Sequence, residues 1–448
     1  MTIRRWLLLT LLFALIVHGE KAVARNSTLA TELDRWVRPL AERRAVAGTF
    51  LIARRGQVLL CRAYGLASIE HQVPNTCETR YMIGSISKQF TAAAILALEE
   101  DGKLSIDDPV AKYIPDFPSA GRITLRHLLT HRAGIVRDMP NPRTVAMPHT
   151  TRELVDIIKA APLQFDPGER ASYSNSGYRV LAFIIEQVSG ESYSSFVRRR
   201  ILDRARMAES GDRDDQDLVP RLAVGYDPWI GAGGIGPAPV HSLSNGRGPG
   251  SLYSSVRDLL RWNAALSNDS VLSAASRRKM LDETEPLGTG IRKRYGMTSI
   301  GHNGVYFGYT GFLEWIPERD LTMIYLGNIE SGASVTALQD AVVAIALGEK
   351  PEPPPGVPSV TGTPEGEQPG YTGVYEAGPI VLYVTSYRGH LLLGAGESDF
   401  PLDRIAGDEF FYPLKYSRVR FTRDASGKVD GLKWLEGDGA YDFKRRSP

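Results

Sequence analysis

The chain has 448 residues, of which 43% are hydrophobic and 23% are charged, an ordinary balance for globular proteins. This length is typical of about two or three domains, and the composition excludes a mainly disordered chain, a collagen-like fibre and a polytopic membrane protein. The 53 basic and 51 acidic side chains leave a net charge of +2, so the chain lacks the basic character expected of a nucleic-acid-binding protein.

The first 24 residues have the layout of a secretory signal peptide. Arg4 and Arg5 form a positively charged start, an apolar run extends from Trp6 to Val17, and the small-residue site Ala22-Val23-Ala24 follows. A transmembrane anchor is the alternative, but it needs about 20 apolar residues, and the paired arginines leave twin-arginine export as a minority route. We therefore expect a periplasmic or secreted mature protein without a stable membrane span.

Apolar spacing predicts the first elements of the mature chain. A helix is expected over Leu29–Leu40, with Pro39 as a point where it kinks or ends. Two strands, Gly48–Ala53 and Val58–Tyr64, are expected on either side of an Arg55-Gly56 turn. The Ala-rich segment Ser85–Glu100 predicts a helix that ends at an Asp-Gly pair.

The only two cysteines, Cys61 and Cys77, both belong to the mature chain. In an oxidising compartment they can form a disulfide, whose closed loop would stabilise the fold by about 3 kcal/mol in the chain-entropy model. Two unpaired buried thiols are an equally consistent alternative. Two cysteines alone do not make a zinc or iron–sulfur site.

The middle of the chain predicts helices followed by a final pair of strands. The strands Phe312–Ile316 and Leu321–Leu326 are separated by a Pro317–Asp320 turn. Helices are expected at Leu125–Thr130, Glu153–Ala161, Gly177–Gln187, Val256–Leu266 and Val335–Leu347. Because strands lie near both ends and helices between them, we expect one sheet that is closed by distant segments.

The composition changes at residues 351–370, where seven prolines crowd a short polar stretch that is typical of a semi-rigid linker. Beyond it, short strand-like runs separated by Gly and Asp predict a small β-barrel or sandwich. The eight runs are Tyr371–Tyr375, Ile380–Thr385, Leu391–Leu393, Phe400–Ile405, Glu409–Tyr412, Arg418–Thr422, Leu432–Leu435 and Tyr441–Lys444. Its aromatic residues are expected in the core rather than in a ligand cage: Tyr383, Phe410, Phe411, Tyr412 and Trp434.

A Ser-x-x-Lys motif opens the Ala-rich helix. Positions i and i+3 share a helical face, so the hydroxyl of Ser85 and the amine of Lys88 can meet, where the helix N-terminus favours an oxyanion. Lys88 can act as a base only if burial or a nearby cation lowers its pKa. Alone the motif is weak, since a surface pair is commoner and a second copy, Ser276 to Lys279, is present.

Two further motifs follow along the chain. In Tyr173-Ser174-Asn175 the phenol can relay a proton if a cation lowers its pKa, and the amide can orient Lys88 and bind a substrate carbonyl. A helix-capping turn would explain the same residues. His302-Asn303-Gly304 stands just before a strand-like run, where glycine allows close approach of a substrate and the N–H of Val305 can complete an oxyanion hole.

The three motifs in this order resemble the penicillin-recognising serine hydrolases, which include class C β-lactamases, D-alanyl-D-alanine carboxypeptidases, D-aminopeptidases and related esterases. The resemblance covers about residues 30–348 and includes further stretches: Tyr64-Gly65-Leu66-Ala67, Ile83 to Thr91, His127 to His131, and Gly250 to Ser254. It implies an α+β fold, in which helices and a helical subdomain flank an antiparallel sheet. The implied organisation is a signal peptide (1–24), a hydrolase domain (25–350), a linker (351–370) and a small lipocalin-like β-barrel (371–448).

The resemblance also implies roles for individual residues. Ser85 resembles the acylated nucleophile, Lys88 its activating base, and Tyr173 the acid/base that protonates the leaving group and activates water. Asn175 resembles the positioning residue for substrate, with Gly304 and Val305 lining the site. The barrel is expected to stabilise the protein, although in relatives with such a barrel it can shape access to the cleft or mediate assembly.

His302 departs from the Lys-Thr-Gly pattern of many relatives. A permanent cation at this position favours a substrate carboxylate, whereas histidine resembles the peptidase, aminopeptidase and esterase branches. The nearby basic run Arg292-Lys293-Arg294 could supply a carboxylate partner, but a solvated loop is the stronger interpretation. His127 and His131 stand four residues apart without a third metal ligand and are interpreted as structural. No G-x-S-x-G elbow is present.

The sequence therefore predicts an exported serine hydrolase that needs no metal or organic cofactor. Its expected substrates are small molecules or peptides, namely amides with D-amino acids, peptidoglycan-like fragments, or esters. A β-lactamase that hydrolyses penicillins or cephalosporins is one alternative. A non-catalytic binding or scaffold protein is another, although the complete set of motif residues argues against it.

Overall fold

The computed structural model describes residues 27–139, 146–227, 235–330, 332–353, 365–378, 380–387, 390–394, 399–412, 417–436 and 439–446. The expected signal peptide and most of the Pro-rich segment lie outside these ranges. Among the described residues, no helix combines the length and the apolar composition that a bilayer span needs.

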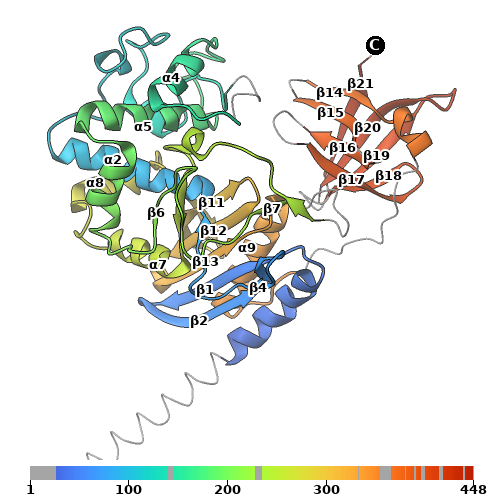
Figure 1. Ribbon diagram of the computed structural model, residues 1–448, viewed down its shortest axis with the longest axis horizontal. Helices are drawn as coiled ribbons and strands as arrows, with labels where there is room; N and C mark the ends of the chain where they lie inside the picture. Colours follow the sequence, from blue (N-terminus) through green and yellow to red (C-terminus); the bar gives the residue numbers. More distant parts are fainter. Residues whose placement is uncertain are drawn as a thin grey trace, which may run out of the picture.

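The main domain is built on a six-stranded antiparallel sheet with the strand order β10-β11-β12-β13-β1-β2 (Figure 1). The strands are β1 (Gly48–Arg54), β2 (Gln57–Tyr64), β10 (Gly290–Arg294), β11 (Met297–Tyr306), β12 (Tyr309–Ile316) and β13 (Leu321–Gly327). The pairing of β1 with β13 aligns Phe50 with Tyr325, which confirms that segments far apart in the sequence close one sheet. Strands β10 and β11 were not predicted from the sequence.

Helices cover both faces of this sheet. Side chains alternate along each strand, so Phe50 and Tyr325 pack on one side against α9 (Gly332–Leu347) and the helix of residues 27–42. That first helix continues past Pro39 to residue 42, so it does not end at Pro39. Leu51 and Ile324 face the opposite side, together with α2 (Ser87–Glu100).

A helical subdomain surrounds α2, in which 12 residues are buried, as expected for a central helix. Its surroundings include α3 (Leu125–Leu129), α4 (Thr151–Lys159), α5 (Asn175–Ser189), α6 (Tyr193–Val197), α7 (Val256–Ala265) and α8 (Ala274–Met280). Helices α3, α4, α5 and α7 confirm four of the predicted elements. The short strands β3 to β9 lie before α2 and between α6 and α7: Leu66–Ser68, Val73–Pro74, Tyr81–Met82, Gly211–Asp212, Tyr226–Asp227, Gly236–Pro237 and Leu252–Ser254.

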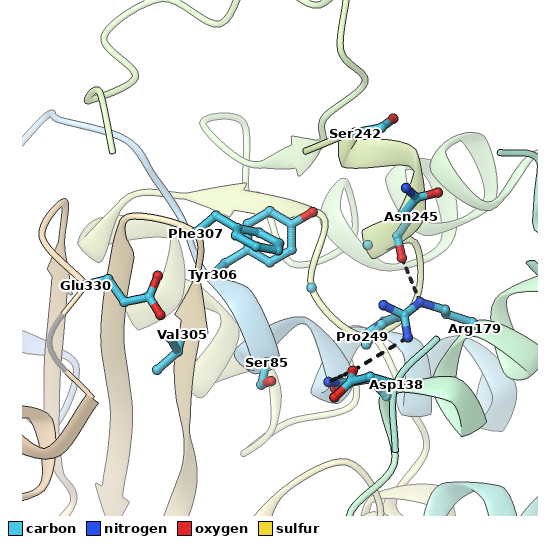
Figure 2. A pocket seen from close by; sticks show the side chains of 13 residues that line it. Ser85, Asp138, Arg179, Ser242, Asn245, Pro249, Val305, Tyr306, Phe307 and Glu330 are labelled. Atoms are coloured by element: carbon cyan, nitrogen blue, oxygen red, sulfur yellow. Dashed lines mark hydrogen bonds and ion pairs between the residues drawn. The ribbon is translucent and has the colours of Figure 1, made fainter. Parts of the chain in front are cut away.

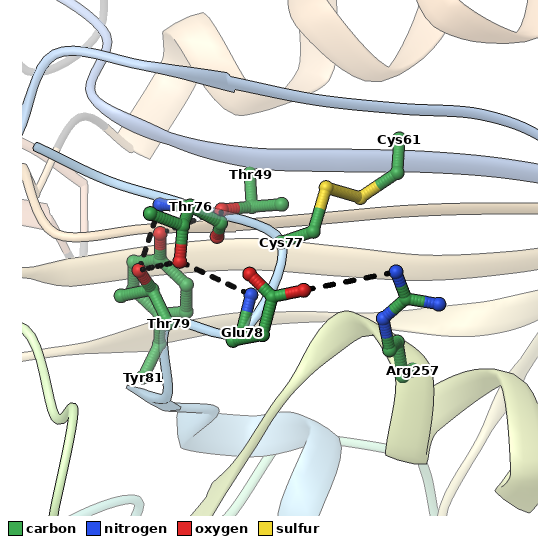
Figure 3. The surroundings of a disulfide bond; sticks show 8 residues. All are labelled: Thr49, Cys61, Thr76, Cys77, Glu78, Thr79, Tyr81 and Arg257. Carbon is green, nitrogen blue, oxygen red and sulfur yellow. Dashed lines mark hydrogen bonds and ion pairs between the residues drawn. A yellow bond between two sulfur atoms is a disulfide. The ribbon is translucent and has the colours of Figure 1, made fainter.

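Cys61 and Cys77 form a disulfide with a Cα–Cα separation of 6.2 Å (Figure 3). Cys61 belongs to β2, and Cys77 lies in the segment that leads towards Ser85. Hydrogen bonds from Thr49 hold the same segment, one to the carbonyl of Thr76 and one shared with the phenol of Tyr81, both 2.8 Å long. Strand β2, through the disulfide, and strand β1, through hydrogen bonds, therefore both hold the segment that leads to Ser85.

The C-terminal part forms a closed antiparallel barrel of eight strands. They are β14 (Gly373–Ala377), β15 (Ile380–Tyr387), β16 (His390–Gly394), β17 (Asp399–Ala406), β18 (Glu409–Tyr412), β19 (Ser417–Arg423), β20 (Val429–Glu436) and β21 (Gly439–Arg445). All eight predicted runs are confirmed as strands. Phe410, Tyr412 and Trp434 pack in a hydrophobic core of the barrel, and Phe411 is also buried, whereas Tyr383 is 44% exposed and its expected core position is wrong.

Candidate active site

Ser85 lies in a 3₁₀ turn, Gly84–Ile86, immediately before α2. Strand β11 crosses this turn so closely that both segments need glycine at the crossing. A Cβ atom on Gly304 would lie 2.0 Å from the carbonyl oxygen of Ile83, and one on Gly84 would lie 2.6 Å from that of Val305. The backbone of Val305 is thereby placed beside the nucleophile, as an oxyanion hole made by the N–H groups of Ser85 and Val305 requires.

Two side chains contact Ser85. Its Oγ lies 3.0 Å from Nζ of Lys88 and accepts a 2.7 Å hydrogen bond from the phenol of Tyr173. Tyr173 precedes α5, and Ser174 caps that helix by accepting a hydrogen bond from the N–H of Gly177. The helix-capping turn at Tyr173-Ser174-Asn175 and the contact of Tyr173 with Ser85 therefore occur together, because the cap fixes the entry to the helix.

Lys88 is completely buried. Besides Ser85, its amine contacts two acceptors, Oδ1 of Asn175 at 2.8 Å and the carbonyl of Pro249 at 3.1 Å. A neutral amine has two N–H groups and one lone pair, so donation to these acceptors leaves the lone pair for the Ser85 hydroxyl. Burial lowers the pKa of Lys88 well below its usual value, and the charge of Arg179 lowers it further, so the neutral form is favoured.

Asn175 connects Lys88 to a charged pair that the sequence analysis missed. Its amide donates a 2.7 Å hydrogen bond to Asp138, and a guanidinium nitrogen of Arg179 lies 3.8 Å from the same carboxylate. Since Nδ2 bonds to a carboxylate, Oδ1 must face Lys88. Asp138 and Arg179 therefore fix the orientation of the Asn175 amide. No motif includes either residue, because they come from separate segments.

His302 lies inside β11 and not just before a strand, so that expectation is wrong. Asn and Gly have weak strand propensity, but pairing with β12 aligns His302 with Leu313 and Gly304 with Gly311. Burial, followed by the charge of Lys88, lowers the pKa of His302 to about 4. Its ring is therefore neutral at pH 7, and Nδ1 lies 2.5 Å from the carbonyl of Asn303.

Burial raises the pKa of Tyr173 to about 12, although its hydrogen bond with Ser85 and the charge of Arg137 act in the opposite direction. The phenol thus stays protonated in the resting site and can donate its proton. Its ring packs against His131, with 4.5 Å between ring centroids. His131 also accepts a hydrogen bond from the backbone N–H of Ser174 at 3.1 Å, which makes it a neighbour of the site.

His127 and the second Ser-x-x-Lys motif, Ser276 to Lys279, have other partners. His127 completes a capping box at the start of α3, and no group of three His, Cys, Asp or Glu side chains within the described ranges could hold a metal ion. Ser276 is in α8, where Lys279 bonds to Glu99 at 2.7 Å.

The basic run forms strand β10 rather than a loop, although Arg292 and Lys293 are exposed to solvent as expected. Arg292 and Arg294 form ion pairs with the buried Glu314, at 3.3 and 2.6 Å. A buried carboxylate needs such partners, and both arginines are therefore directed to the sheet.

A pocket of about 160 Å³ opens beside Ser85 (Figure 2). Asn175 and Arg179 line one side, and Val305, Tyr306 and Phe307 line another. Glu330 also contributes to its wall. A second pocket is lined by His131, Arg132 and His302.

Comparison with known proteins agrees with this geometry. A family model described as Beta-lactamase matches residues 33–347. The chain belongs to the beta-lactamase family. It is 30% identical over 321 residues to penicillin-binding protein 4* of Bacillus subtilis (strain 168), an overlap of 65% of this chain and 70% of the relative.

Two solved structures are similar to this beta-lactamase-family protein. The octameric penicillin-binding protein homologue from Pyrococcus abyssi is 26% identical, with a TM-score of 0.62, over 94% of this chain and 99% of the homologue. A D-amino acid amidase from Ochrobactrum anthropi SV3 has a TM-score of 0.65 at 22% identity, over 72% of this chain and 99% of the amidase, which shows a shared fold. The family and the α+β fold class predicted from the sequence are confirmed.

Proposed function

We propose that this protein is an exported serine hydrolase that forms an acyl-enzyme at Ser85. Its preferred substrates are small amides and peptides with D-amino acids, and related esters are also substrates. The observation that carries the proposal is the placement of Ser85 Oγ within hydrogen-bond distance of both the Lys88 amine, at 3.0 Å, and the Tyr173 phenol, at 2.7 Å. A nucleophile next to a base and an acid is the arrangement that acyl transfer requires.

In the proposed acylation step, the neutral amine of Lys88 takes the hydroxyl proton of Ser85 while Oγ bonds to the substrate carbonyl carbon. The negative charge on the carbonyl oxygen is stabilised by the N–H groups of Ser85 and Val305. Tyr173 then gives its proton to the leaving nitrogen or oxygen, whose bond to carbon breaks. Lys88 returns its proton to the phenolate, so both residues regain their starting states.

Deacylation repeats this sequence with water. The Tyr173–Lys88 pair removes a proton from the water as its oxygen attacks the ester carbonyl, and Ser85 leaves with a proton restored. No other group is needed to balance the reaction.

The neutral state of His302 supports the choice of substrate class. With a pKa of about 4, its ring offers no cation to a substrate carboxylate at pH 7. Arg292 and Arg294 are paired with Glu314. Amides, peptides and esters therefore fit this site better than the carboxylate-bearing β-lactams.

Intact-mass analysis of residues 25–448 after incubation with benzylpenicillin tests the proposal. A lasting adduct is expected on the native chain and not on Ser85→Ala, while Lys88→Met should lower the acylation rate by several orders of magnitude. Ser276→Ala is the matched control and should behave as the native chain. An adduct that survives in Ser85→Ala would contradict the assignment of the nucleophile.

Hydrolysis assays separate the remaining outcomes. Turnover of D-alanine p-nitroanilide or a p-nitrophenyl ester, lost in Ser85→Ala, is the expected result. Rapid, continuing consumption of benzylpenicillin would instead identify a β-lactamase. A folded protein that neither hydrolyses these substrates nor forms an adduct would favour the binding or scaffold function.

A further inference from the structure

Glu330 is an acidic residue in the wall of the pocket that contains Ser85. It follows β13, its side chain is 9% exposed, and its Oε2 accepts a 2.9 Å hydrogen bond from the N–H of Gly308. Figure 2 shows its carboxylate beside Val305 and Tyr306, on the side of Ser85 opposite Arg179. A carboxylate is thus held by the β11–β12 turn within the substrate pocket.

Asp227, at the end of β7, lies next to Glu330. It is 5% exposed, and its carboxyl group forms a hydrogen bond with that of Glu330. Its Oδ1 has no hydrogen-bond partner among the described residues. Burial raises the pKa of both groups, and for Asp227 the charge of Glu330 adds to the effect.

This pair differs from the other buried acids. Other acids with buried side chains within the described ranges, Asp212, Asp258 and Glu314, form ion pairs with arginines. Asp227 and Glu330 have no Lys or Arg partner within 4.0 Å in that part of the chain. Buried charge without a counter-ion is costly, and where it borders a substrate pocket a cationic ligand is the natural partner.

The position of Tyr173 indicates which part of a substrate reaches Glu330. Tyr173 packs against His131 and faces His302, at ring distances of 4.5 and 6.3 Å, and both histidines line the second pocket. A leaving group protonated by Tyr173 belongs on that side. The pocket bordered by Glu330 then holds the acyl part of the substrate.

We propose that Glu330, positioned by Asp227, binds an ammonium group on the acyl side of the scissile bond. This inference rests on the proposed acyl transfer at Ser85 and narrows its substrates to amine-bearing acyl groups. The ammonium is either the free α-amine of an amino-acid amide or the side-chain amine of a basic residue. An ammonium in this pocket would form a charge-assisted hydrogen bond with Glu330. It would act as the counter-ion that arginines provide for Asp258 and Glu314.

Two matched substrate pairs test the inference. D-alanine p-nitroanilide and its N-acetyl derivative differ only in the α-amine, and Nα-acetyl-D-lysine and Nα-acetyl-D-norleucine p-nitroanilides differ in the side-chain amine. The native chain should show a kcat/KM at least tenfold higher for the amine-bearing member of one pair. Glu330→Gln should remove this preference, whereas Glu78→Gln, the same change beside Arg257 at the disulfide, should retain it (Figure 3).

The outcomes separate this inference from the proposed function. A preference in the alanine pair identifies an α-amine, and one in the lysine pair identifies a side-chain amine. Equal rates within both pairs, or a preference that persists in Glu330→Gln, would overturn the inference while leaving acyl transfer at Ser85 in place. If none of the four substrates is hydrolysed and Ser85 forms no adduct, the proposed function fails and this inference with it.

The test does not depend on the folding of one variant. Equal rates for the native chain already overturn the proposal. If Glu330→Gln does not fold, Glu330→Asp can be measured instead. Its shorter side chain keeps the charge but withdraws it from the pocket, so part of the preference should be lost.

Discussion

Lys88 lies among charges of both signs. Arg179 and Arg137 lower its pKa, and Asp138 raises it. The histidines facing the same space, His131 and His302, have pKa values of about 3 and 4 and are neutral at pH 7. The proton affinity of the base is therefore set by burial and by residues that do not touch the nucleophile.

Two substitutions should move the pH dependence of acylation in opposite directions. Acylation needs neutral Lys88, so its rate falls as the pH drops through the Lys88 pKa. Arg179→Gln removes a charge that lowers this pKa and should shift the acid limb to higher pH, whereas Asp138→Asn should shift it to lower pH. Stopped-flow acylation from pH 5 to 9 measures both, and shifts in the same direction would contradict the electrostatic role.

His302→Lys should change substrate selectivity. A permanent cation in β11 would attract a substrate carboxylate, so the second-order rate of acylation by benzylpenicillin should rise at least tenfold relative to that by a neutral ester. The lysine introduced at position 302 should also lower the Lys88 pKa. The acid limb of the pH profile of acylation should therefore move to lower pH. His302→Gln, which is neutral, is the control, and an equal gain in that variant would count against the charge effect.

At the level of residues, the sequence predicts the side chains that belong to motifs and misses those that do not. Ser85, Lys88, Tyr173 and Asn175 are recognisable because their order and spacing are specific. Arg179 is one arginine among many, and only the turn of α5 brings it to Asp138. Its role follows from three-dimensional proximity alone.

The crossing of β11 over the 3₁₀ turn is the contact that assembles the site. It brings the carbonyl of Ile83 against a strand that lies more than two hundred residues later in the sequence. A Cβ on Gly304 would have no room beside that carbonyl. The proposed oxyanion hole thus depends on the absence of a side chain at Gly304.

Gly304→Ala should therefore abolish acylation by displacing β11 from the turn. We expect a loss of at least a hundredfold in acylation rate, because a 1 Å displacement at a reactive centre can cost about that much, together with a lower Tm. Gly296→Ala, at a left-handed turn with open space around it, is the control for a strained glycine: it should lower Tm and leave acylation near normal. Normal acylation in Gly304→Ala would argue against the crossing.

At the level of elements, predictability follows the strength of the local pattern. The barrel strands alternate and are separated by turn residues, so all eight were predicted. Strand β11 contains Gly, His and Asn and has no such pattern; pairing with β12 and contact with the 3₁₀ turn stabilise it instead. The element that carries the site is thus the one that local pattern predicts least well.

The molecule has separate hydrophobic cores. Trp262 stacks on Phe90 in the main domain, with ring centroids 4.4 Å apart, and Trp434 packs against Tyr412 in the barrel, at 5.1 Å. These tryptophans belong to different clusters of buried residues. The sequence indicated this division through the change of pattern after the Pro-rich segment.

We therefore expect two unfolding transitions in differential scanning calorimetry. Trp434→Ala should destabilise the barrel by about 3–5 kcal/mol, the usual cost of deleting a buried tryptophan, and lower one transition only. Trp262→Ala should lower the other transition. A single transition that shifts as a whole in both variants would show instead that the two parts unfold together.

The pairing of β1 with β13 also has a consequence for how the protein is made. A ribosome produces β1 and β2 early, but the neighbour that completes the sheet is not available until residue 327 has been synthesised. Until then the nascent chain exposes an apolar strand edge and lacks its core, a state that is prone to aggregation. If the protein is exported as we propose, such a chain would stay unfolded, and therefore able to pass through a translocase, during most of its synthesis.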